Sequence, residues 1–128
     1  MQPIWIKSIP HKKQRYDTIG DYFDDYGNTL IFVSDMKNED YEFLVALHEM
    51  IEHYLCRKRG IKEKDIMAFD VKFEAERKKG KHSKDAEPGD DRRAPYRHEH
   101  WAATDIEKQI AQELKVDWKK YCKVVSAL

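Results

Sequence analysis

Residues 41–59 read YEFLVALHEMIEHYLCRKR, and the rest of the predicted architecture is built around them. Apolar side chains flank two histidines and two glutamates within the six residues His48-Glu49-Met50-Ile51-Glu52-His53. Ionisable groups inside an apolar run are costly to remove from water unless they are paired or bind a metal ion. The stretch therefore predicts a central helix with either a metal site or an ordinary solvated stripe of His–Glu pairs.

The ends of this helix are marked by capping residues. Asn38 is a suitable N-cap, and the acidic residues that follow it favour the positive end of the helix dipole. Gly60 is a natural stop after a basic last turn, so we expect a helix over residues 39–59. At about 100° per residue, one broad arc is apolar and includes Phe43 and Tyr54. The opposite arc is expected to be half covered and to hold a polar pocket.

The polar arc offers a metal site with a catalytic base beside it. His48 and Glu52 are four residues apart, so they point the same way and can supply two adjacent metal ligands. Glu49 would lie on the neighbouring edge, where H-E-x-x-H zinc enzymes place the glutamate that acts as general base on water. His53 comes one residue late for that register, and the motif here is H-E-x-x-E.

Composition indicates one domain over residues 1–128 and excludes several classes of protein. The chain is 41% hydrophobic and 38% charged, with a formal net charge of zero that disfavours nucleic-acid binding. No apolar run reaches the roughly 18 residues of a membrane span, and the N-terminus lacks a signal-peptide core. Cys56 and Cys122 are expected to be reduced thiols, and the protein is expected to be cytoplasmic.

The remaining elements predict an α+β fold. A strand at residues 4–6 and a hairpin of residues 21–24 and 29–33 form a small N-terminal antiparallel sheet that packs on the central helix. Further helices are expected over residues 61–79, over residues 94–116 and after Asp117, with Asp65 and Asp70 as surface or capping residues. A polar loop at about residues 78–94 is either a mobile lid or a plain disordered connection.

The helix at residues 94–116 carries a third candidate metal ligand. His100 and Glu107 share its apolar face, whereas His98 points toward the surface. If this helix packs on the central one, His48, Glu52 and His100 form a set of two histidines and one carboxylate with an open position for water. The alternative is a core histidine hydrogen-bonded to Glu52 or Glu107. Whether His53 or Glu107 joins the metal site is open.

The chain resembles small zincin-type metalloproteins in the order of its elements. A sheet comes first, then the helix with the H-E-x-x-E motif, and then a helix with a third candidate ligand. The segments at residues 41–49, 87–91 and 93–97 also look like small uncharacterised phage and prophage proteins. The zincin resemblance implies a divalent metal, most simply zinc, and an edge strand that holds an extended substrate. Glu52 replaces the second zincin histidine, and a carboxylate favours iron or manganese more than histidine does.

These observations lead to competing functions. The first is a metal-dependent hydrolase, a peptidase among the options, in which Glu49 is the general base and the metal polarises the scissile carbonyl. The second is a phage-encoded factor that binds a host protein and keeps a structural or vestigial metal site. The partner is accordingly an unknown peptide or host protein. A nucleic-acid module using the basic residues 77–84 with Lys12, Lys13 and Arg15 is the weakest option.

Overall fold

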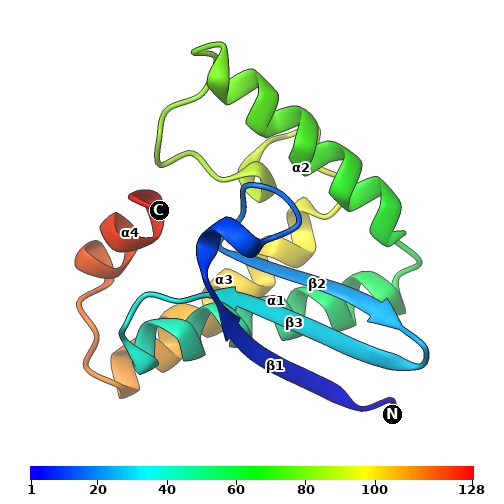
Figure 1. The fold of residues 1–128 in the computed structure, drawn as a ribbon, viewed down its shortest axis with the longest axis horizontal. Helices are drawn as coiled ribbons and strands as arrows, with labels where there is room; N and C mark the ends of the chain where they lie inside the picture. Colours follow the sequence, from blue (N-terminus) through cyan, green and yellow to red (C-terminus); the bar gives the residue numbers. More distant parts are fainter.

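The computed structural model describes all 128 residues, as a three-stranded sheet and four α-helices (Figure 1). The predicted α+β class is confirmed. In chain order the elements are β1 (Ile4–Ile9), η1 (His11–Lys13), β2 (Gly20–Asp25), β3 (Asn28–Ser34), α1 (Glu39–Lys58), α2 (Glu63–Lys78), η2 (Pro88–Asp90), α3 (Arg97–Glu113) and α4 (Trp118–Ser126), where η denotes a single 3₁₀ turn.

The sheet is mixed, and the prediction of a purely antiparallel sheet was wrong. Strands β2 and β3 form the predicted hairpin, because Tyr26 and Gly27 both have positive φ, as its two-residue turn requires. The strand order is β1-β3-β2, and β1 pairs parallel to β3. Residues 10–19 carry the chain past the central position to the far edge. The strand that then fills the centre runs in the same direction as β1.

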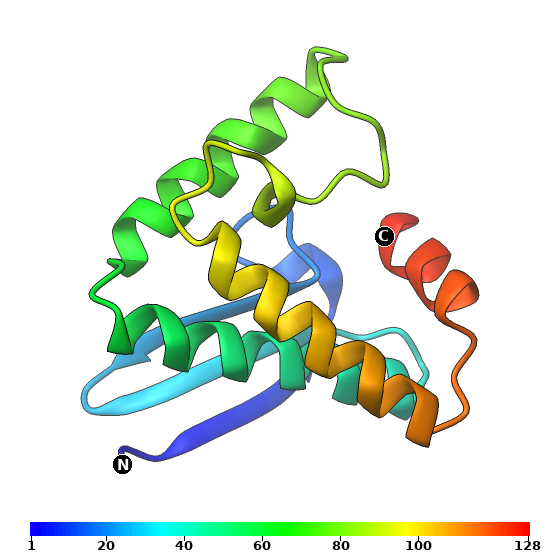
Figure 2. The ribbon, with the colours of Figure 1, turned by 180° about the vertical axis from the view of Figure 1, so that it is seen from behind.

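Helix α1 lies between the sheet and α3, as Figures 1 and 2 show from opposite sides. It begins where predicted, because the Asn38 side chain accepts a hydrogen bond from the Tyr41 backbone N–H. Leu44 on α1 and Ile31 and Val33 on β3 are almost fully buried and form the centre of the core. The predicted central position of this helix is therefore confirmed.

The two arcs of α1 are covered differently from the expectation. Phe43 and Tyr54, on the apolar arc, remain 51% and 49% exposed. His48, Glu52 and Cys56, on the polar arc, are buried. Partners on β2 and α3 cover the polar arc and supply its hydrogen bonds. These hydrogen bonds replace the ones that the polar side chains would make to water, so the polar arc can be buried.

Asp70 on α2 also departs from the prediction, whereas Asp65 is exposed as expected. Asp70 is buried because two phenols reach it: the hydroxyls of Tyr16 and Tyr96 both donate to its carboxylate. Tyr16 lies in the connection between β1 and β2, and Tyr96 directly precedes α3. The side chain therefore joins three separate parts of the chain.

The long connection between α2 and α3 is held to α2 by side chains. The Arg77 guanidinium donates to the backbone carbonyls of Ser83 and Ala86. The His82 ring stacks on Phe73, with ring centroids 3.9 Å apart. The mobility predicted for this connection stays a prediction.

None of the helices has the length and apolar character needed to cross a membrane.

Candidate metal centre

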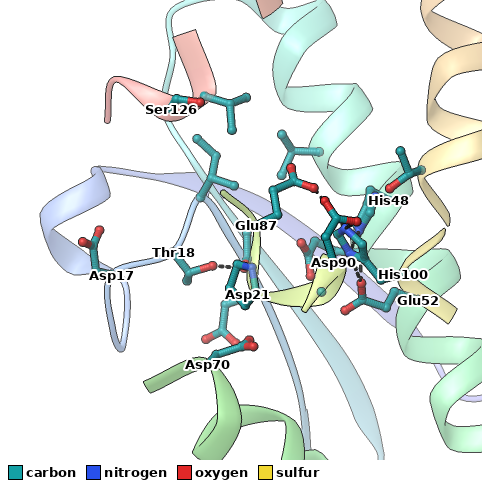
Figure 3. Close-up of a pocket in the computed structure, with 18 of the residues that line it drawn as sticks. Asp17, Thr18, Asp21, His48, Glu52, Asp70, Glu87, Asp90, His100 and Ser126 are labelled. Atoms are coloured by element: carbon teal, nitrogen blue, oxygen red, sulfur yellow. Dashed lines mark hydrogen bonds and ion pairs between the residues drawn. The ribbon is translucent and has the colours of Figure 1, made fainter. Parts of the chain in front are cut away.

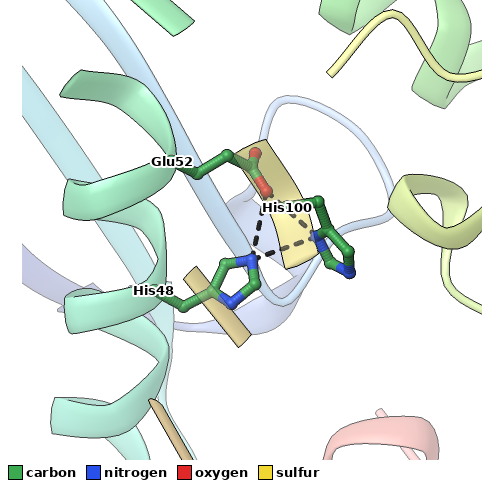
Figure 4. Close-up of side chains that lie close together, drawn as sticks. All are labelled: His48, Glu52 and His100. Carbon is green, nitrogen blue, oxygen red and sulfur yellow. Dashed lines mark hydrogen bonds and ion pairs between the residues drawn. The ribbon is translucent and has the colours of Figure 1, made fainter. Parts of the chain in front are cut away.

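Three of the predicted site residues meet between α1 and α3. The Nε2 atom of His48 lies 3.1 Å from Glu52 Oε2 and 3.1 Å from His100 Nδ1, and the last two atoms are 3.0 Å apart (Figure 4). All three side chains are more than nine-tenths buried. His48, Glu52 and His100 therefore lie close enough together to hold a metal ion.

Local structure explains why these atoms converge. His48 and Glu52 are one turn apart on α1, so their side chains reach the same point beside the helix. His100 lies in the first turn of α3, which packs against α1. Gly89 in η2 lies directly against the His100 ring: a Cβ atom there would be 2.2 Å from the ring's Cγ. This close contact with Gly89 limits how far the ring can move.

Carboxylates fix the protonation of both rings. His48 Nδ1 lies 2.8 Å from Glu107 Oε1, and His100 Nε2 lies 3.0 Å from Glu87 Oε2. An ionised carboxylate only accepts hydrogen bonds, so each of these ring nitrogens is the N–H donor. In the neutral tautomers, the two nitrogens that face Glu52 therefore carry lone pairs. Where three lone pairs point at one position, a metal cation bound there stabilises the arrangement.

The same carboxylates set the charge of the site. Burial opposes a charged ring at His48, yet hydrogen bonds with Glu107 and Glu52 raise the pKa of His48 well above its ordinary value. In the same way, burial is outweighed at His100, where Glu52 and Glu87 raise its pKa to about 10. Hydrogen bonds from the two rings outweigh burial at Glu52 and lower its pKa to about 2. The environment therefore favours positive charge between these side chains, which a proton or a metal ion can supply.

The donor set and its spacing fit a zinc ion. Nitrogen and oxygen ligands at about 2.0–2.2 Å from a tetrahedral zinc lie roughly 3.3–3.6 Å from one another. The separations of 3.0–3.1 Å are a few tenths of an ångström shorter, which is within the reach of small side-chain rotations. Three protein ligands leave the fourth position of such an ion for water or substrate.

Glu49, the predicted general base, is not one of the three side chains whose donor atoms lie together. It lines the same cavity as His48 and Glu52, and its carboxylate touches Gly20 at the start of β2. Burial and the negative charge of Glu52 raise the pKa of Glu49 well above its ordinary value. A raised pKa makes the carboxylate form of this side chain a stronger base.

Two histidines considered from the sequence lie elsewhere. His53 is 3.3 Å from Asp24 and packs edge-on against the Tyr22 ring, away from the ligand set. His98 is exposed, as predicted. Glu107 faces inward, as predicted, but it is not one of the three side chains whose donor atoms lie together. It accepts a hydrogen bond from His48 and another, 2.6 Å long, from the Tyr121 hydroxyl.

Sequence reasoning missed Glu87 and Asp90, which approach His100 Nε2 at 3.0 and 3.6 Å. They lie in a polar connection where helical periodicity gives no direction. Pro88 and Gly89 between them were the available signal, because a glycine between acidic residues permits close approach to another side chain.

The ligand set opens into a cavity of about 640 Å³. Its walls come from the β1–β2 connection, β2, α1, α2, the connection that carries Glu87, α3 and α4 (Figure 3). The volume is that of a small-molecule or peptide side-chain site.

Comparisons with protein-family models, with curated proteins and with solved structures found no match. The resemblance to zincins and to phage proteins therefore stays a prediction, and function is argued from the site alone.

Proposed function

We propose that this protein is a metal-dependent hydrolase that holds zinc with His48, Glu52 and His100 and uses Glu49 as general base. The observation that carries the proposal is the convergence of two imidazole nitrogens and one carboxylate oxygen within 3.1 Å of each other. Without a cation these three acceptors repel one another, unless protons intervene. Burial makes that repulsion stronger, because the interior screens charge poorly.

Each residue has a separate part in the reaction. A divalent ion supplies Lewis acidity, which polarises a carbonyl group and acidifies water. Glu49 takes the proton from the attacking water and returns it to the leaving group, a role that its raised pKa suits. Glu107 and Glu87 orient the two imidazole rings through their N–H groups.

The position of β2 supports a peptide as substrate. This strand lies at the edge of the sheet, and Gly20, Asp21 and Tyr22 line the cavity beside Glu49. An extended peptide can pair with the part of this edge near Gly20 and place its carbonyl groups in the cavity, whereas the Asp24 N–H at the other end already donates to Glu63. Zinc is the first expectation, and the carboxylate ligand Glu52 makes iron and manganese the alternatives.

Two measurements test the proposal. Elemental analysis of the purified protein should find about one zinc, iron or manganese per chain, and His48→Ala should lose it. A library of mixed peptides should then be cleaved by the wild type. Glu49→Gln should keep the metal and lose at least about 100-fold in rate, because only the base is removed. Metal-free protein whose thermal stability is unchanged by added zinc, iron or manganese would refute the site.

A second function is favoured by the outer face of α1. Phe43 and Tyr54 are about half exposed there, and an apolar helix face that the rest of the chain leaves uncovered can contact another protein. In this alternative the chain is a phage-encoded factor that binds a host protein, and the metal is structural or vestigial. Metal-loaded protein that cleaves no peptide, or activity that is unchanged in Glu49→Gln, would favour this alternative.

A further inference from the structure

Asp70 is a buried carboxylate that the proposed reaction does not use. It lies on α2, is 9% exposed and lines the cavity that contains the metal ligands (Figure 3). The Tyr16 hydroxyl donates to its Oδ2 at 3.0 Å, and the Tyr96 hydroxyl donates to its Oδ1. These two hydrogen bonds hold both oxygens of the carboxylate in fixed positions.

What distinguishes Asp70 is the absence of a positive partner. The other buried acidic residues lie within 3.1 Å of a basic group: Asp21 with Arg15, Glu99 with Arg59, Glu52 with His48 and His100, and Glu107 with His48. Asp70 has two neutral phenols instead. Burial accordingly raises the pKa of Asp70 to about 7, even though both phenols favour the ionised form.

The cavity as a whole also carries an excess of negative charge. Eleven aspartates and glutamates line it against four lysines and arginines and three histidines, although the whole chain has 24 acidic residues and 24 lysines and arginines. Arg15 and Arg77 are two of those four, and each already pairs with a carboxylate, Asp21 and Glu74 respectively. A concave surface with an excess of one charge concentrates ligands of the opposite charge.

We propose that Asp70 binds an organic cation, the ammonium or guanidinium group of the substrate. The assignment of this cationic group to a substrate rests on the proposed function, whereas the cation site itself does not. An ammonium or guanidinium group that enters the cavity supplies the counter-charge that Asp70 lacks and donates hydrogen bonds to its oxygens. Within the peptide proposal, this selects substrates with lysine or arginine side chains. The competing role for Asp70 is purely structural, as a protonated acceptor between Tyr16 and Tyr96.

The test uses small probes and the 128-residue chain as purified. n-Butylammonium, n-propylguanidinium and neutral 1-butanol are titrated at constant ionic strength, and binding is followed by NMR shifts. We expect at least one of the two cations to bind at least about tenfold more tightly than butanol. Asp70→Asn should remove this preference, because the amide keeps the size and loses the charge. Asp65→Asn, an exposed site on the same helix, is the matched control and should keep it.

The outcomes are separable from those of the hydrolase proposal. Equal binding of both cations and butanol, or an unchanged preference in Asp70→Asn, overturns the cation site. If Asp70→Asn does not fold, nuclear Overhauser contacts between a bound cation and the Tyr16 and Tyr96 rings of the wild type decide instead, and their absence overturns it. Tight cation binding without peptide cleavage supports the cation site and counts against the hydrolase proposal.

Discussion

Gly89→Ala should disrupt the metal centre through a single methyl group. The added Cβ would lie 2.2 Å from Cγ and 2.4 Å from Nδ1 of His100. An ordinary contact needs at least about 3.4 Å, so the ring or the η2 backbone must move by roughly 1.2 Å. A shift of this size would change the contacts of His100 Nδ1 with His48 and Glu52, which are 3.1 and 3.0 Å long.

The expected effect is a loss of zinc affinity of at least about 100-fold, because a displaced ligand costs more than the 10–100-fold typical of a lost second-layer hydrogen bond. The assay is competition for zinc against a chromophoric chelator at fixed pH and ionic strength. Circular dichroism of the metal-free variant shows whether the fold persists. The displaced ring should also lose its hydrogen bond to Glu87, which a two-dimensional NMR spectrum of the histidine nitrogens reports.

Wild-type zinc affinity in a folded Gly89→Ala protein would refute the reasoning. It would mean either that His100 is not a ligand or that the η2 turn moves away at negligible cost. His100→Ala separates these explanations, because it removes the ligand without a steric clash. Unchanged affinity in both variants would place the metal elsewhere.

Three other perturbations have distinct expectations. Gly20→Ala places a Cβ 2.8 Å from the Glu49 side chain and not against a ligand, so zinc titration should be unchanged while peptide cleavage falls at least about tenfold. Glu107→Ala removes the acceptor of the His48 N–H and should weaken zinc binding about 10–100-fold; Glu107→Gln, which keeps an acceptor oxygen, should restore part of the loss. Burial raises the pKa of Asp70 from 3.8 to about 7, so its contribution to stability is complete below pH 3.8 and is lost as the pH rises through 7. In urea unfolding of metal-free protein, the wild type should therefore lose roughly 2.5 kcal/mol relative to Asp70→Asn between pH 5 and pH 8; parallel pH profiles would contradict this.

Helical periodicity singled out three side chains that the structure brings together, His48, Glu52 and His100. The pair on α1 follows from the four-residue spacing of His48 and Glu52, and the inward direction of His100 follows from the apolar residues that share its face. The packing of α1 on α3 was a hypothesis, and it brings the three donor atoms together. Regular local geometry therefore carried most of the information about the candidate site.

Features that depend on tertiary partners were not predictable in the same way. Asp70 has the spacing of a surface residue, and only the phenols of Tyr16 and Tyr96 make its burial favourable. The parallel pairing of β1 depends on the path of residues 10–19, which local pattern does not specify. Glu87 acts from an irregular segment, where neither a period of 2 nor one of 3.6 assigns a direction to a side chain.

The spacing of the pairings along the chain has a consequence for folding kinetics. The β2–β3 hairpin joins near neighbours such as Asp24 and Thr29, whereas β1 must find β3 across 25 positions, from Ile4 to Thr29. The His48–His100 contact spans 52 positions. Contacts that close long loops carry the larger entropic cost, so we expect them to form late, after the transition state. An ion held by those two helices should then slow unfolding while leaving the folding rate almost unchanged.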